Sequence, residues 1–277
     1  MGGNVKKYFK KEFQLRMCSL DHEDPSDFCI TCWQRNRSVW PLLVIRTLIM
    51  IGCVSTVISS FVIMIQDQMG AGHWFIFMTH WGLIMNTVAS LLAFGISLTE
   101  LLRGEDSTPP MLVKCYWLFY NIAITIAFFI TIFYWSLLTD VVEGDYAMDP
   151  VLDVFIHGIN SVLMFCLLVT SRHPHRLMHF YIPLLFGIIY MIFSIIYYFA
   201  GGLSPFGTNW IYPMLDWSKP GETVLMVLGT AILIILIHMI VAAMTVSRDA
   251  LTKRYRETTV IPISNGQSNG MSSNYLR

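Results

Sequence analysis

Three residues that together could carry out acid–base chemistry lie close to one another in an apolar stretch of the sequence. Asp153, His157 and Asn160 are four and three positions apart, so they share one face if the stretch is helical. The Asp153 carboxylate could accept a hydrogen bond from one ring nitrogen of His157, which would fix the imidazole tautomer and raise its basicity. A base held in this way activates the nucleophile in many hydrolytic sites.

A hydroxyl that such a base could activate lies in an earlier apolar stretch, which contains Thr79, His80 and Asn86. Thr79 and Asn86 are seven positions apart and share a helix face, while His80 points about 100° away from Thr79. Thr79 lies about five residues inside its stretch and His157 about seven residues inside its own. At about 1.5 Å per residue these are similar depths, provided that both helices enter the membrane from the same side.

We therefore predict that Thr79 is a nucleophile and His157 its base, with Asp153 orienting the imidazole. Asn160 is the predicted oxyanion donor. The alternative is that these side chains form only the interhelical hydrogen bonds that Thr, Asn and His commonly supply in membrane bundles. Spacing alone leaves both interpretations open.

The sequence carries no recognisable cofactor or metal motif beside these residues. There is no glycine-rich phosphate loop, no HExxH and no GxSxG. Cys29 and Cys32 are spaced like half of a zinc site, but without a regular second pair we favour reduced or S-acylated thiols. His173 and His175 lie in a basic turn that we expect to face lipid headgroups. We predict neither a cofactor nor a metal.

The composition requires that the candidate site be held by membrane helices. Hydrophobic residues make up 55% of the 277 residues and charged residues only 13%, against about a quarter charged in soluble domains. The mean hydropathy is +0.58. The net charge is zero, so we expect membrane lipids and membrane-protein partners rather than a nucleic acid.

Six apolar runs separate short polar connections, and each run is long enough to cross about 30 Å of hydrocarbon as a helix. Since barrel strands alternate over only about ten residues, we predict an all-α bundle of about six transmembrane helices. The predicted domains are an N-terminal segment (1–39), the transmembrane domain (40–246) and a disordered tail (247–277). The runs are Trp40–Ile65, Trp74–Leu98, Leu112–Leu138, Pro150–Thr170, Phe180–Ala200 and Glu222–Val246.

Basic residues predict the orientation of this bundle. Sixteen Lys and Arg residues lie in the two terminal segments and in the second-to-third and fourth-to-fifth connections, whereas the other three connections hold only Lys219. Because Lys and Arg near a span end resist translocation, both termini are predicted to be cytosolic. Arg46 lies a turn or two inside the first span, where we expect it to snorkel towards the cytosolic surface.

Four sequence motifs resemble those of a known family, the rolling stone family of insect membrane proteins. The resemblance runs from about Cys29 to the end of the last span. It implies a multi-pass protein, placed by us at the plasma membrane, with a role in myoblast fusion during muscle development. The motifs are MTHWG at 78–82, HGINS at 157–161, the glycine pair at 201–202 and IYPMLDW at 211–217.

A more remote resemblance bears on chemistry. The androgen-induced family of intramembrane threonine hydrolases cleaves fatty-acid esters with one intramembrane Thr and one intramembrane His. Thr79 and His157 are similarly placed in this sequence. The resemblance implies, as an alternative function, an intramembrane lipid-ester hydrolase that uses these two residues.

Overall fold

The fold is all-α over the residues that the computed structural model describes, which are 2–67, 69–105, 107–139 and 149–258. Six helical segments within these ranges are long and apolar enough to cross a membrane, as predicted. The α-helices are α1 (Gly2–Glu12), α2 (Trp40–Gln66), α3 (Ala71–Trp74), α4 (Met78–Arg103), α5 (Pro110–Phe133), α7 (Pro150–Val154), α8 (Asn160–Thr170), α9 (Tyr181–Phe199) and α10 (Pro220–Thr258).

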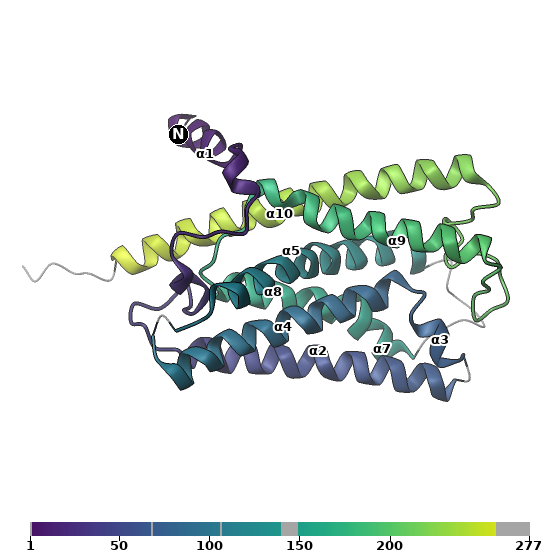
Figure 1. Ribbon diagram of the computed structural model, residues 1–277, viewed down its shortest axis with the longest axis horizontal. Coiled ribbons are helices and arrows are strands. Elements are labelled where there is room, and N and C mark those ends of the chain that lie inside the picture. The colour runs from purple at the N-terminus through teal and green to yellow at the C-terminus, as the bar shows by residue number, and fades with distance from the viewer. Residues whose placement is uncertain (1, 68, 106, 140–148, 259–277) are drawn as a thin grey trace, which may run out of the picture.

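Helix α5 is the centre of the bundle (Figure 1) and packs against α4, α8, α9 and α10. In its most apolar stretch 56% of the residues are buried inside the protein, compared with 28% in α2 and 22% in α10. Small side chains on α5, such as Ala123 and Ala127, are fully buried and let neighbouring helices approach closely. The outer helices α2, α9 and α10 present exposed apolar side chains, as expected of surfaces that face lipid.

The second span begins at Met78 instead of at Trp74. Trp74 closes the short helix α3, and α4 begins only at Met78. Gly70, at φ +80°, precedes α3 in the left-handed region that favours glycine. Thr79 therefore lies in the first turn of α4, nearer the helix start than the five residues we expected from the sequence.

Both ends of the described chain lie at the same end of the bundle (Figure 1), which we call the terminal end. There the Arg256 guanidinium donates to the Cys32 carbonyl at 2.7 Å. The expectation that Arg46 snorkels is wrong, since its side chain is 0% exposed. It donates instead to the carbonyls of Ala93, at 3.0 Å, and of Phe28 in the N-terminal segment, at 2.8 Å.

The turn that connects α8 with α9 is buried too, although we expected it to face lipid headgroups. His173 and His175 are 1% and 3% exposed, because Phe28 of the N-terminal segment stacks on His173 and His238 of α10 contacts His175. Arg176 holds that segment in place by donating to the carbonyls of Ser19, at 2.6 Å, and Asp21, at 2.8 Å. Arg176 thus binds backbone carbonyls of the N-terminal segment instead of the lipid headgroups that we expected.

Helix α10 extends past the last predicted span boundary at Val246. We predicted disorder from residue 247, whereas the helix continues to Thr258. Arg248 stabilises the extension by donating to the carbonyls of Leu168, at 2.8 Å, and His173, at 3.0 Å. The rest of the predicted tail lies outside the described residues.

The cytosolic orientation of both termini stays a prediction, and thiol labelling tests it. We expect a membrane-impermeant maleimide to label Ser218→Cys, in the connection before α10, on intact cells. Glu105→Cys, at the terminal end, should label only after permeabilisation, because the basic loops there resist translocation. The unsubstituted protein is the blank for the native cysteines. Labelling of Glu105→Cys alone on intact cells would invert the topology.

The buried turn also predicts how stability depends on pH. Burial lowers the pKa of His173 and of His175 well below the ordinary value, and the cation of Arg248 lowers both further. Below about pH 6.5 the unfolded chain therefore binds more protons than the folded protein, so stability is full above that pH and falls as the solution is acidified. The measurement is the thermal unfolding midpoint of detergent-solubilised protein between about pH 7.5 and 5.

The variant His175→Gln should flatten this dependence, while His73→Gln, at the other end of the bundle, should leave it unchanged. An unfolding midpoint that rises on acidification would contradict the buried position of the turn.

Candidate functional site

A cavity of about 430 Å³ lies at the end of the bundle opposite the termini. The start of α4, the end of α5, the segment from α7 to α8 and the connection before α10 all contribute to its wall. Most of the wall is apolar. The polar side chains that line it include Thr79, His80, Tyr134, His157 and Tyr212. Two of the predicted site residues, Thr79 and His157, therefore face one cavity.

The predicted contact between Asp153 and His157 is present. His157 Nδ1 lies 2.7 Å from Asp153 Oδ1. Because a carboxylate can only accept, Nδ1 carries the proton and Nε2 is left as the basic nitrogen. The imidazole also stacks on Tyr134 with ring centroids 3.5 Å apart and planes 4° from parallel. The carboxylate and the stacked ring together fix the orientation of His157.

Both rings of this stack come from π-helical turns. Tyr134 opens the turn Tyr134–Leu138 at the end of α5, and His157 lies within Phe155–Ile159 between α7 and α8. A π-turn inserts one residue into a helix and rotates the faces on either side of it, and such turns often occur at functional sites. The two wider turns bring the phenol face to face with the imidazole.

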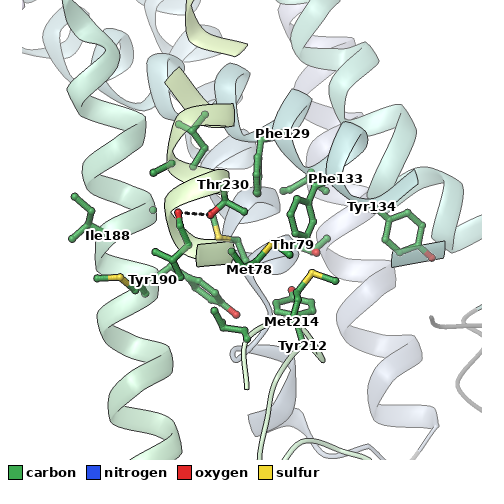
Figure 2. Close-up of a pocket in the computed structure, with 18 of the residues that line it drawn as sticks. Met78, Thr79, Phe129, Phe133, Tyr134, Ile188, Tyr190, Tyr212, Met214 and Thr230 are labelled. Carbon is green, nitrogen blue, oxygen red and sulfur yellow. Dashed lines mark hydrogen bonds between the residues drawn. The ribbon is translucent and has the colours of Figure 1, made fainter. Parts of the chain in front are cut away.

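Thr79 lies where two cavities meet. Besides the large cavity it lines a smaller one of about 130 Å³ between α5, α9 and α10 (Figure 2). Tyr134, Leu138 and Tyr212 also line both. The Tyr212 phenol lies beside Thr79 and Tyr190, and burial raises its pKa. Tyr212 thus keeps its proton and can donate a hydrogen bond beside the Thr79 hydroxyl.

Asn160 makes contacts that differ from those of an oxyanion donor. Its side-chain oxygen accepts a hydrogen bond from Asn86, and its NH₂ group donates to the Ile156 carbonyl at 3.0 Å. Among the described residues it is not part of the wall of either cavity. In this state the two asparagines tie α4 to α8, as the packing alternative expects. The oxyanion role of Asn160 stays a prediction that would require its side chain to turn.

Three residues of the site, His80, Tyr134 and Tyr212, were not predicted as site residues from the sequence. His80 stacks on Trp74 at 4.4 Å, and its Nδ1 lies 2.6 Å from the Trp74 carbonyl. Although its helix position points away from Thr79, the cavity wraps around the start of α4 and reaches both. Tyr212 lies in a connection without regular structure, where periodicity gives no signal. The IYPMLDW motif was the one feature that could have identified it.

No group of three or more His, Cys, Asp or Glu side chains in the described parts of the chain could hold a metal ion. An oriented imidazole, a hydroxyl and a phenol donor around an apolar cavity are the groups that acyl transfer uses.

Comparison with known proteins gives the chain a family. The family model described as Protein rolling stone matches residues 3–258. The chain is 27% identical over 248 residues to Protein rolling stone of Drosophila melanogaster, an alignment that covers 82% of this chain and 85% of that protein. No solved structure matches. The family match includes all six spans and the candidate site, and this multi-pass helical membrane protein belongs to the rolling stone family.

Proposed function

We propose that this protein acts in the fusion of muscle precursor cells, as a multi-pass protein of the plasma membrane that works through lipids or membrane-protein partners. The observation that carries the proposal is family membership over nearly the whole chain. The resemblance to rolling stone implies the role in myoblast fusion. The bundle adds a large lipid-facing surface on α2, α9 and α10, on which such contacts could form.

Genetic rescue tests this role. Muscle precursor cells that lack the protein should form few multinucleate cells, and expression of the unsubstituted chain should restore fusion. The fraction of nuclei in multinucleate cells is the measurement, with surface biotinylation as the control for delivery. Normal fusion in cells without the protein would contradict the proposal.

A second candidate, an intramembrane lipid-ester hydrolase, is favoured by one specific observation. Thr79 and His157 line the same apolar cavity, and Asp153 holds the imidazole with Nε2 as its basic nitrogen. A side-chain hydroxyl is a weak nucleophile until a base takes its proton. A largely apolar wall also suits a fatty ester that enters from the bilayer.

The chemistry balances with these groups alone. Thr79 Oγ attacks the ester carbonyl while His157 Nε2 accepts the hydroxyl proton, directly or through one water. The imidazolium then gives this proton to the departing alcohol, which leaves an acyl ester on Thr79. A water molecule, deprotonated in turn by His157, attacks the acyl ester. Release of the fatty acid regenerates the Thr79 hydroxyl, so one ester and one water yield one acid and one alcohol.

Covalent labelling tests the hydrolase candidate. A fluorophosphonate probe should label the purified protein at Thr79, and Thr79→Ala should abolish labelling. Asp153→Asn should slow it by roughly 100-fold or more, because a misoriented base loses most of a general-base effect. Thr87→Ala is the matched control, since Thr87 lies on the same helix and bonds back to the Leu83 carbonyl. Equal labelling of Thr79→Ala and the unsubstituted protein would exclude the mechanism.

The same variant connects the two candidates. If fusion needs only lipid or protein contacts, Thr79→Ala protein that reaches the cell surface should restore fusion as well as the unsubstituted chain does. If fusion needs the chemistry, Thr79→Ala should fail in the rescue while Thr87→Ala succeeds. Either result, read with the labelling, assigns the cavity to the fusion role or separates it from that role.

A further inference from the structure

The two cavities differ in the chemistry of their walls. The smaller one is surrounded by side chains such as Phe129, Phe133, Ile188 and Met214, with Thr79 and Tyr212 at its edge (Figure 2). The Thr230 hydroxyl, which also lines it, donates back to the Val227 carbonyl of its own helix at 2.9 Å. The space between α5, α9 and α10 thus offers hydrocarbon contacts and suits an alkyl chain.

The larger cavity offers hydrogen-bond acceptors in addition to apolar wall. His80 Nδ1 must donate to the Trp74 carbonyl, so in the neutral ring Nε2 is an acceptor. Nε2 of His157 is likewise an acceptor, because its Nδ1 donates to Asp153. The Asp67 carboxylate lies on this wall as well. Hydroxyl groups on a ligand are the natural partners for such acceptors.

The charged residues in the cavity walls further restrict the chemical class of the ligand. Neither Lys nor Arg is among the described residues that line either cavity, whereas the larger one contains Asp67. A phosphate or a carboxylate would enter without a cation to pair with and would face this carboxylate, which is unfavourable in an apolar setting. The walls therefore select an uncharged head.

Hydroxyl groups gather where the two cavities meet, and this junction suits a carbonyl group of the ligand. Three residues with a hydroxyl group line both cavities, namely Thr79, Tyr134 and Tyr212, and the Tyr212 phenol lies beside Thr79. A carbonyl oxygen at this point would accept a hydrogen bond from the Tyr212 phenol. That is the role that the sequence assigned to Asn160, whose amide is engaged with Asn86 and Ile156.

We propose that the two cavities form one binding site for an uncharged, single-chain acyl ester of a polyol, of the acylglycerol type. The acyl chain fills the small cavity, the ester carbonyl accepts from Tyr212 beside Thr79, and the polyol hydroxyls donate to His80 in the large cavity. Cleavage of the bound ester rests on the hydrolase candidate, but the binding itself needs no turnover.

Photocrosslinking tests the site. The probe is a monoacylglycerol with a diazirine in its acyl chain and an alkyne for detection, added to the purified full-length protein in detergent. We expect labelled peptides from α9 and α10 around residues 187–191 and 226–231. The acyl-matched lysophosphatidic acid and free fatty acid probes are anionic and would face Asp67 without a cation to pair with. They should therefore label at least about tenfold less, which corresponds to about 1.4 kcal/mol of binding free energy. Equal or stronger labelling by the anionic probes would overturn the charge argument.

Two variants that fill the small cavity, with a control on the same helix, test the position of the acyl chain. Ala231→Phe and Thr230→Leu add bulk to its wall and should each lower crosslinking severalfold. Gly229→Leu adds bulk on the same helix where nothing lies within 4 Å, and should leave crosslinking unchanged. The thermal unfolding midpoint of each variant shows whether it is folded. If both filling variants are folded and their labelling is unchanged, the acyl chain does not bind in this cavity.

Two further variants separate binding from chemistry. Thr79→Ala should keep the crosslink and lose fluorophosphonate labelling, so that a failed hydrolase candidate leaves the lipid site standing. Tyr212→Phe should slow release of fatty acid from the monoacylglycerol by roughly 100-fold, the usual cost of one oxyanion donor, while crosslinking falls by less than about threefold. Loss of crosslinking in step with turnover would make Tyr212 a packing residue and contradict its role at the carbonyl.

Discussion

Buried guanidinium groups that donate to main-chain carbonyls are the interaction on which the rest of this structure depends. Arg46 joins α2 to α4 and to Phe28 of the N-terminal segment. Arg176 binds the same segment through the carbonyls of Ser19 and Asp21, and Arg248 joins α10 to the turn after α8. An arginine side chain stays charged in proteins, and a buried charge is costly unless hydrogen bonds compensate it. Each arginine therefore requires its carbonyl partners to stay in place.

This constraint divides the bundle into two functional ends. At the terminal end the N-terminal segment and the turn with His173 and His175 fill the space between the helices, and Phe28, Tyr116 and Trp117 are fully buried there. At the opposite end the helices diverge around two cavities that meet at Thr79. The packed end provides a rigid frame, and the open end holds an oriented imidazole, a hydroxyl and a phenol. A frame of this kind is what precise placement of reacting groups needs.

The sequence predicted the features that local pattern determines. The first span, expected from Trp40 to Ile65, is observed from Trp40 to Gln66, because a continuous apolar run of that length has few alternatives to a membrane helix. The contact between Asp153 and His157 could be predicted from their separation by one helical turn. Such features depend on residues that are neighbours along the chain, so spacing is sufficient to find them.

Features that depend on distant segments were missed or misplaced. Arg46 was expected to snorkel because no residue near it in the sequence indicates that the Phe28 carbonyl is its partner. The sequence around His173 and His175 suggests an exposed basic turn, because their partners Phe28 and His238 lie far away along the chain. His80 reaches the cavity because of the break before α4, and Tyr212 lies in an irregular connection. Neither feature produces a hydrophobic periodicity in the sequence. The pairing of Asn160 with Asn86 likewise joins residues on two helices and diverts an amide that the sequence assigned to catalysis.

A cryo-electron microscopy map of the protein in a lipid nanodisc would test the central claim, that the polar residues of α4 and of the α7–α8 segment share one lipid-binding cavity. We expect elongated density from between α9 and α10 to the Thr79 hydroxyl, with His157 on the same cavity and the Arg46 side chain enclosed at the opposite end. A map in which Thr79 and His157 are separated by packed side chains, with no space between them, would contradict it.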